Sequence, residues 1–532
     1  MISQVMMQTD IEKGSRPSPS RNSSLSTLCG DDVSSKAPTI CGRESPTSQD
    51  PSQDKHRSEP ESLLVSWDRP HDPENPKNWN RRQKWTMSLI ISAFAFLSPL
   101  SSSIAAPALG PIGHDLHIDN QVQLQLVLSI FLLTYALGPF ILSPCSEIWG
   151  RTPIVRVGNT IFILFTTLCG FATSKGQIIA FRFLAGIGGS ATTGMGSGVL
   201  TDCWRPEERG KGIAVMQFAP VIGPALGPIV GGYISQYATW RWAFWTVVIF
   251  NVAVQALAFF LLKETYAPRL LVLKARELRK ESRNPEFQTA WEREQRTLTK
   301  ILRVSLSRPW VMLATQPIIQ SLAVLQAFNF GLLYLVISGF PTLWEGHYEM
   351  SKGRASLNYI SIAVGSLIGV LICAPTMDAV YRRLKTKSGI GMEEPGRPEF
   401  RIPLMIPSSV ITPAGMLLFA WSAQNRMHFL IPNIGIAITM GSTMISYQCI
   451  SAYIADSYPQ YTASASAACC FMRSIFAFVF PLFVPALFGK LGYGLGGSLL
   501  AGIAVVIGVP APILLWVFGA RLRGMSRFSI RE

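Results

Sequence analysis

Twelve long apolar runs, separated by short polar loops, constrain this chain more than any other feature. About 20 apolar residues cross a bilayer as a helix, because a helix satisfies its own backbone hydrogen bonds where water is absent. The predicted spans are 85–106, 122–143, 155–173, 177–200, 212–235, 241–262, 311–338, 356–378, 402–421, 429–453, 463–488 and 495–519. We therefore expect an all-α polytopic membrane protein whose twelve transmembrane helices form two six-helix bundles.

The charged residues divide the chain into regions. Only 15% of the residues are charged, against about 25% in a soluble protein, and they collect between and beyond the apolar runs. The N-terminal residues are rich in Ser and Pro, which is typical of disorder. The expected regions are a disordered cytosolic N-terminal tail at 1–84, a first bundle at 85–262, a basic cytosolic loop at 263–310, a second bundle at 311–520 and a cytosolic C-terminal tail at 521–532.

Basic residues in alternate loops predict the orientation. The segment 263–309 holds twelve Lys and Arg, whereas loop 107–121 holds none. Lys and Arg accumulate on the cytoplasmic side of membrane proteins. Both termini and the central loop are therefore expected in the cytosol, and the central loop is expected to be partly helical, with Leu271 and Leu278 on one face.

Several other classes of partner and cofactor are not expected. The net charge of +15 is explained by basic residues beside membrane spans, so no nucleic-acid partner is predicted. The nine cysteines lack the paired spacing of disulfides or zinc sites. The His114-Asp115-x-His117-x-Asp119 sequence opens a span, where polar caps are expected, so no metal is predicted. No Gly-rich Lys-Ser/Thr phosphate loop is present, which argues against ATP as the energy source.

A run of glycines and prolines lies inside the fifth predicted span. It comprises Gly223, Pro224, Gly227, Pro228, Gly231 and Gly232. Glycines one helical turn apart leave one face bare, so a neighbouring helix can approach closely, and prolines leave bends whose backbone groups neighbours must satisfy. This pattern predicts a packing and hinge device, with plain close packing as the alternative.

The two halves of the chain echo each other. Span two ends in Pro144-Cys-Ser146-Glu147-Ile-Trp-Gly150-Arg151, and span eight ends in Pro375-Thr-Met-Asp378-Ala-Val-Tyr-Arg382. Each segment places an acid three residues after proline and an arginine four residues later. Parallel repeats of this kind are typical of two-bundle transporters.

These motifs resemble those of the major facilitator superfamily, and the chain is similar to its fungal twelve-span drug:proton antiporters. Further matching segments are Asp72-Pro-Glu-Asn-Pro-Lys-Asn-Trp79, Arg182-Phe-Leu-Ala-Gly186 and Tyr453-Ile-Ala-Asp-Ser-Tyr458. The resemblance covers about residues 66–525. It implies the two-bundle fold of that superfamily, a monomer in the lipid bilayer and a location in the plasma membrane, with the vacuolar membrane as the alternative.

The resemblance also implies roles for the motif residues. The gating motif comprises Pro144, Ser146, Glu147, Gly150 and Arg151, with Asp378 and Arg382 in the second half. A charge within a span is costly and functional by default; the family places such an arginine, here Arg182, in proton coupling, with snorkelling to the membrane surface as the alternative. The Gly223 to Gly232 run is the family's antiporter motif.

Polar and aromatic residues within apolar spans are candidates for a substrate cavity, although part of the set is expected to join helices instead. They are Gln217, Gln316, Gln320, Gln326, Asn329, Asn358, Tyr359, Tyr447, Gln448, Tyr453 and Arg473. Arg473 is equally consistent with binding an anionic group and with pairing to an acid.

These features predict a secondary transporter, not an enzyme. It is expected to export drug-like or toxic small organic molecules, including metabolites of the same cell, in exchange for protons, with the proton gradient in place of a cofactor. A proton-coupled importer or polyamine transporter of the same fold is the nearer alternative, and a non-transporting membrane sensor is the more distant one.

Overall fold

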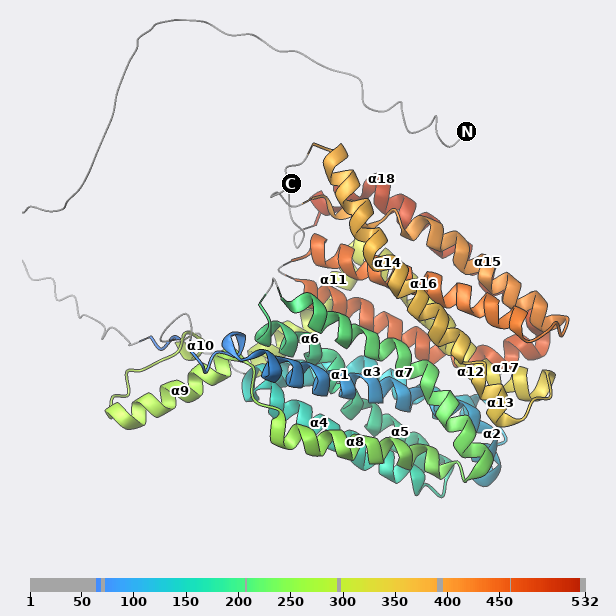
Figure 1. The fold of residues 1–532 in the computed structure, drawn as a ribbon, viewed down its shortest axis with the longest axis horizontal. Helices are drawn as coiled ribbons and strands as arrows, with labels where there is room; N and C mark the ends of the chain where they lie inside the picture. The colour runs from blue at the N-terminus through green and yellow to red at the C-terminus, as the bar shows by residue number, and fades with distance from the viewer. Residues whose placement is uncertain are drawn as a thin grey trace, which may run out of the picture. The chain divides into compact units, whose positions relative to one another are not determined.

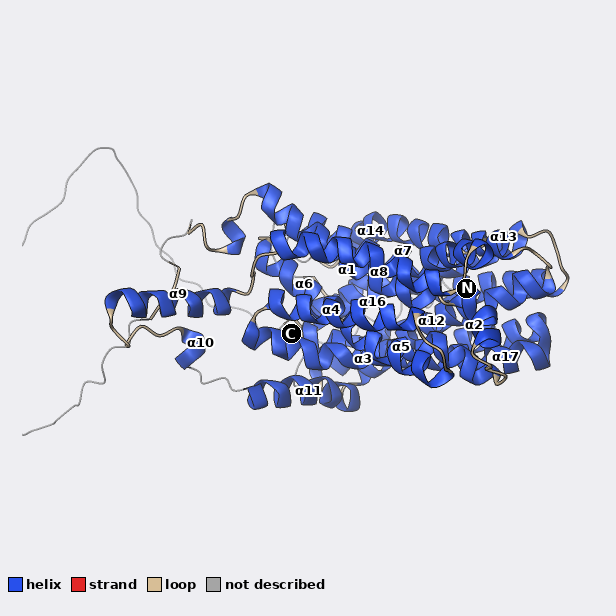
Figure 2. Cartoon of the chain, turned by 90° about the horizontal axis from the view of Figure 1, so that it is seen from below, coloured by secondary structure: helices blue, strands red, loops and turns tan. Residues whose placement is uncertain are grey.

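The computed structural model describes residues 64–67, 72–205, 208–293, 298–389, 396–459 and 461–526, without the side chains of 209–215, 217–219 and 298–305. Regular structure in these ranges is helical (Figure 2), apart from one isolated bridge between Leu64 and Gln288. The α-helices are α1 (Arg81–Ser103), α2 (Leu109–Asp115), α3 (Gln121–Trp149), α4 (Arg151–Gly170), α5 (Lys175–Gly189), α6 (Ala191–Cys203), α7 (Arg209–Tyr237), α8 (Arg241–Leu261), α9 (Ala267–Ser282), α10 (Ala290–Arg293), α11 (Leu298–Thr315), α12 (Pro317–Pro341), α13 (Lys352–Leu357), α14 (Ile360–Lys387), α15 (Met405–Gln424), α16 (Leu430–Ser457), α17 (Thr462–Gly508) and α18 (Pro510–Gly524). Three 3-10 turns, η2 (Pro76–Asn78), η3 (Ala106–Ala108) and η5 (Pro398–Arg401), and a π-helical turn, η4 (Thr342–His347), complete the list.

These helices account for twelve spans. Ten helical stretches are long and apolar enough to cross a membrane by length and composition. The last of them, Thr462–Gly524, contains two spans, because α17 turns back at Gly492, whose φ is 71°. Helix α7 supplies the remaining span, so the expected twelve-helix, all-α fold is confirmed.

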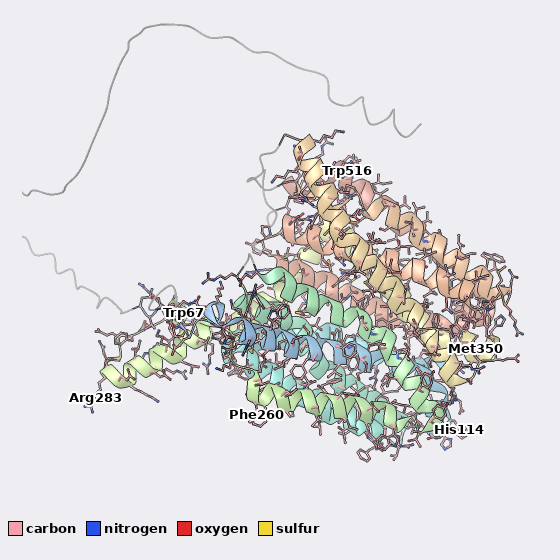
Figure 3. The ribbon with its side chains drawn as sticks, viewed as in Figure 1. Trp67, His114, Phe260, Arg283, Met350 and Trp516 are labelled. Atoms are coloured by element: carbon pink, nitrogen blue, oxygen red, sulfur yellow. The ribbon has the colours of Figure 1, made fainter. Side chains whose placement is uncertain are left out.

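Lipid-facing side chains surround the helices. Phe260 on α8 is 80% exposed, Val506 is 73% exposed and Leu371 is 63% exposed. Figure 3 shows Phe260 on the outer flank of the first half, away from the other helices. Large apolar side chains exposed in such numbers are stable in hydrocarbon and not in water.

The two halves share a core at one end only. One cluster of buried residues joins Ile104 and Phe131 of the first half to Leu332 and Trp344 of the second. At the other end, where the basic loops lie, each half has a cluster of its own. We call this the basic end; Figure 3 shows Arg283 there, with His114 and Met350 at the opposite end. The halves are thus joined more extensively at the opposite end.

Residues 72–84 are ordered, so the predicted tail at 1–84 extends too far toward the first span. The Asp72 carboxylate accepts a bond from the Glu74 amide and pairs with Lys274 of α9 at 3.0 Å. Asn75 caps η2, and Asn80 caps α1. The 72–79 motif therefore forms a capped turn held against α9, which runs alongside it in Figure 1. Residues 1–63 and 68–71 lie outside the described part.

The other predicted boundaries also shift. Helix α11 begins at Leu298, inside the predicted loop 263–310, and α9 is helical as expected, burying Val272 and Ala275. The predicted C-terminal tail begins too early, since α18 continues to Gly524 and Arg523 is buried. Residues 527–532 lie outside the description.

Candidate functional site

The glycine run brings α7 into backbone contact with α1. A Cβ at Gly223 would lie 2.9 Å from the Phe96 carbonyl oxygen, and one at Gly227 would lie 2.5 Å from the Leu100 carbonyl oxygen. Gly231 lies equally close to Ile104. The two helices run side by side in Figure 1.

Gly232 lies beside the glycine face of α7 and meets the other half. A Cβ at Gly232 would overlap the Ser356 hydroxyl of α13. One turn further on, the Gln236 side-chain oxygen accepts a 2.6 Å hydrogen bond from the Gly353 amide. Helix α7 therefore contacts α1 within its own half and α13 across the boundary, so Gly232 lies where the halves meet at the opposite end.

Arg182 on α5 is fully buried and binds backbone carbonyls. Its guanidinium donates to the carbonyl oxygens of Ser101 at 2.9 Å, Ser102 at 3.0 Å and Val127 at 3.2 Å. The ring of Phe131 lies 4.9 Å away. Helix α1 ends at Ser103, so its last carbonyls have no partner in their own helix. Arg182 supplies that partner, and the snorkelling alternative is wrong.

The end of α1 also touches the second half. The Ser102 hydroxyl and the Tyr334 hydroxyl of α12 lie 2.8 Å apart. Ser102 therefore has two partners. Its carbonyl accepts a hydrogen bond from Arg182, and its hydroxyl is hydrogen-bonded to Tyr334, so Ser102 connects the buried guanidinium of Arg182 to the second half. Gly227 contacts the same turn of α1 through Leu100 and Ser103.

At the basic end of the first half, Arg151 pairs with Asp202 rather than with a residue of its own motif. The Arg151 Nε lies 2.5 Å from the Asp202 carboxylate at the end of α6. The Glu264 carboxylate, after α8, accepts the Arg151 amide at 3.0 Å and the Thr152 amide at 3.2 Å, capping α4. Gly150 has φ 97°, and any side chain there would overlap Glu264.

The second half repeats this arrangement around Arg401, a residue that the sequence analysis missed. Arg401 precedes α15 and pairs with Asp456 of α16 at 2.9 Å and with Asp378 of α14 at 3.3 Å. Its guanidinium lies 4.2 Å from the centre of the Tyr381 ring. The expected counterpart, Arg382, is exposed and donates to the carbonyl of Asp378.

Arg382 was therefore the wrong counterpart of Arg151. Arg151 begins the third span, and Arg401 precedes the ninth span, which is the equivalent span of the second half. Aligning the two halves by the order of their spans would therefore have identified Arg401, whereas counting residues from the proline identified Arg382. Both arginines bind the carboxylate that ends the following span, Asp202 or Asp456.

The other residues of the gating motif in the first half lie in the last two turns of α3. Pro144 is inside α3, and Ser146 is buried and donates to the Ser143 carbonyl at 2.6 Å. Glu147 lies in the last turn of α3. In the second half, Arg523 and Glu399 form a buried ion pair at 3.0 Å, which ties α18 to the turn before α15.

A narrow pocket of about 10 Å³, which is room for about one water molecule in this conformation, lies between α12 and α16 in the second half. Its walls are Gln326, Asn329, Phe330, Leu333, Thr443, Met444 and Tyr447. Arg473 of α17 borders it: its guanidinium lies 4.5 Å from the Phe330 ring centre and 3.3 Å from the Tyr447 hydroxyl. The structure thus brings together four residues that the sequence analysis proposed for the cavity, namely Gln326, Asn329, Tyr447 and Arg473.

The remaining cavity candidates lie apart from this pocket. Gln316 is buried before α12, Gln320 is exposed and bonds to Ala314, and Gln448 is half-buried on α16. Asn358 bonds to Asn433, and the Tyr359 hydroxyl donates to the Ile337 carbonyl at 2.6 Å.

Asn358 and Tyr359 therefore hold helices together instead of facing a cavity, and so does Tyr453, which is fully buried in the second half's own cluster. Gln316 and Gln320 do not line the pocket between α12 and α16. The side chain of Gln217 lies outside the described part.

Two six-helix halves, sharing a buried core at one end and carrying paired charge clusters at the other, define a two-bundle membrane transporter. Residues 91–481 match the profile of the Major Facilitator Superfamily. The chain is 43% identical to the efflux pump vrtL of Penicillium aethiopicum over 91% of this chain and 94% of that protein. It is 42% identical to an uncharacterized transporter of Schizosaccharomyces pombe over 88% of this chain and 94% of that protein.

A solved structure shows the same fold. The xylose transporter XylE from E. coli, in a partially occluded inward-open conformation, superposes with a TM-score of 0.60 at 16% identity, covering 82% of this chain and 98% of that one. The chain belongs to the Major Facilitator Superfamily, and it is a multi-pass membrane transporter rather than an enzyme.

Proposed function

We propose that this protein is a proton-coupled secondary transporter that exports drug-like or toxic small organic molecules by alternating access. The observation that carries the proposal is the uneven junction of the halves, which share a core at one end and keep separate cores at the basic end. Such a protein opens to one side when the halves rock about a central site. Its relatives with the printed name efflux pump support export as the direction.

The charge clusters at the basic end are suited to gating. Arg151–Asp202 and Arg401–Asp456 each tie neighbouring helices within one half, and each pair is only partly buried. Partly buried pairs can exchange partners between states at little cost, whereas fully buried ones cannot. In the proposed cycle these pairs rearrange when the basic end closes.

Arg182 is the proposed coupling residue. It holds the end of α1, and that end bonds to Tyr334 of the other half, so a change at Arg182 alters the junction directly. The close contact of α7 with α1 at Gly227 and Gly231 is proposed to limit leakage while the halves move.

Orientation and location follow from charge. The basic end faces the cytosol in this proposal, because Lys and Arg accumulate on that side. Both termini are then cytosolic, the membrane is the plasma membrane, and a single chain encloses the whole pathway as a monomer. The proton gradient supplies the energy.

Transport from energised cells tests the proposal. Fungal cells expressing the protein are loaded with fluorescent organic compounds while de-energised and are then re-energised with or without a protonophore. Efflux above that of cells lacking the protein, and abolished by the protonophore, is expected. Uptake of the compounds instead would indicate an importer, and protonophore-insensitive efflux would contradict proton coupling.

A pair of matched variants distinguishes the loss of a gating carboxylate from the loss of a carboxylate elsewhere in the protein. Asp202→Asn removes the carboxylate that Arg151 binds, and Asp115→Asn removes one that binds Trp240 and Arg241 at the opposite end. Typical coupling free energies of about 1–3 kcal/mol predict that Asp202→Asn slows efflux by about fivefold or more. Asp115→Asn is expected to leave efflux close to that of the unmodified protein; equal effects of both variants would remove the gating role.

A further inference from the structure

Arg473 is a cation inside the second half whose hydrogen-bonding capacity is mostly unused. A guanidinium carries five N–H donors. Here one terminal nitrogen contacts the Tyr447 hydroxyl at 3.3 Å, the other contacts the Cys470 sulfur at 3.3 Å, and Nε is buried without a partner. No carboxylate forms an ion pair with Arg473 anywhere in the described ranges. A charge held this way within a membrane span is costly unless a ligand supplies its counter-charge.

The surroundings of Arg473 form a wall suited to an aromatic molecule. Phe330 and Tyr447 present ring faces to the guanidinium, at 4.5 Å and 5.7 Å from its carbon. The same two residues line the pocket, together with the Asn329 and Gln326 amides. The Gln326 side-chain oxygen is also buried without a partner. A buried unpaired polar group is destabilising, and a ligand that pairs with it recovers that cost.

From this arrangement we propose that the pocket selects organic anions, and that the transported molecules are flat aromatic compounds with a carboxylate or another acidic group. The pocket of about 10 Å³ is too small for such a molecule in this conformation, so the ligand enters when α12 and α16 move apart during the transport cycle. Arg473 then binds the acidic group, and Phe330 and Tyr447 stack on the ring system. The Gln326 oxygen accepts from a hydroxyl or amide N–H of the ligand. The inference deepens the proposed export function and rests on it for transport, whereas binding of the anion is independent of it.

The position of Arg473 also connects the pocket to the first half. Phe471, two residues earlier on α17, packs on Trp310 of α11 at 4.6 Å and on Phe140 of α3 at 6.0 Å between ring centres. Helix α17 therefore carries both the anion-binding residue and a contact that crosses the boundary between halves. A ligand that draws Arg473 toward the pocket acts on a helix that must move when the halves rock.

Binding to the full-length purified protein tests the inference with three probes of one shape. Anthracene carboxylate, anthracene carboxamide and aminomethylanthracene differ in charge and not in ring size, and their fluorescence reports saturable binding. The carboxylate is expected to bind about tenfold more tightly than the amide or the amine, as charge-assisted hydrogen bonds predict. Arg473→Gln is expected to abolish that preference, and Arg473→Lys to retain part of it.

A matched control uses another arginine that lies on an aromatic ring. Arg308 of α11 lies 5.3 Å from the Tyr461 ring centre and is not among the pocket residues. Arg308→Gln should leave the preference for the carboxylate intact. Equal binding of the three probes, or a preference for the carboxylate that survives Arg473→Gln, would overturn the anion site.

The transport assay distinguishes failure of the inference from failure of the proposed function. If the carboxylate binds through Arg473 but is not moved against its gradient by reconstituted protein, the anion site stands and export is refuted. If all three probes are exported at equal rates by the protein and by Arg473→Gln, export stands and the anion site is refuted.

Discussion

Arg182 and Arg473 are both arginines inside the membrane-spanning region, and the structure treats them in opposite ways. Arg182 is fully buried and donates three bonds to backbone carbonyls at the end of α1 and in α3. Arg473 is partly exposed, has two long contacts to side chains and leaves Nε unpaired. A charge that is satisfied by the backbone holds the fold, whereas a charge short of partners is available to a ligand.

The largest expected effect is that of Arg182→Ala on stability. It leaves three buried carbonyls without a donor, and each buried acceptor left unpaired costs about 1–3 kcal/mol. Arg182→Lys is expected to lose most of the same stabilisation, because an ammonium lacks the planar guanidinium that reaches separate carbonyls. Thermal unfolding, followed with a thiol dye that labels the buried Cys169 and Cys203, measures the loss. A stable Arg182→Ala protein would mean that the backbone contacts are not what Arg182 provides.

The close contact between α7 and α1 at Gly227 stabilises the same end of α1 that Arg182 binds. Gly227→Leu forces a side chain into Leu100 and Ser103, and overpacking of this kind costs about 1–3 kcal/mol. Gly502→Leu is the matched control, because a side chain at Gly502 meets nothing within 4 Å. The same dye assay is expected to show destabilisation for Gly227→Leu alone. Equal destabilisation by Gly227→Leu and Gly502→Leu would show that the loss of a glycine, and not the contact between α7 and α1, lowers the stability.

The hydrogen bond between Ser102 and Tyr334 measures how strongly the Arg182 region joins the halves. Tyr334→Phe removes this bond, at a net cost of about 0.5–1.5 kcal/mol, and Ser102→Ala removes it together with the 2.6 Å bond from the Ser102 hydroxyl to the Pro99 carbonyl. The double variant is expected to cost no more than Ser102→Ala alone, because Tyr334→Phe removes only the bond that both changes share. Additive losses in thermal unfolding would indicate that the two hydroxyls act separately.

The smallest expected stability change belongs to Arg473→Gln. Neutralising a poorly paired internal charge is expected to leave the free energy of unfolding unchanged or to raise it by about 1 kcal/mol. Thermal unfolding without ligand measures this change. A loss as large as that of Arg182→Ala would show that both arginines are structural, and the contrast between them would disappear.

Much of the fold was predictable because membrane spans are determined by composition. Runs of apolar residues must be helical in hydrocarbon, and alternate basic loops identify one end, so the twelve spans and two halves follow from local sequence. The bare face of α7 was equally predictable, since helical periodicity fixes which glycines share a face. Errors at 72–84 and at Arg523 arose because order there depends on Lys274 and Glu399, which are distant in sequence.

The charge partners could not be predicted from spacing. A motif arginine such as Arg151 has many acids within reach along the chain, and only packing of α4 beside α6 selects Asp202. The same applies to the Arg401 cluster, which draws residues from three separate spans. Side-chain polarity marked Tyr359 and Arg473 alike as cavity candidates, yet one is bonded to its neighbour helix and the other borders a pocket.

Apolar length, loop charge and helical periodicity are local properties, so the amino-acid order alone establishes that this chain crosses a membrane twelve times in two related halves. Which of the two arginines inside the membrane-spanning region has its hydrogen bonds satisfied, Arg182 or Arg473, depends on the packing of the helices. That distinction depends on the carbonyls and carboxylates that distant helices bring to each guanidinium, and no local pattern encodes their positions.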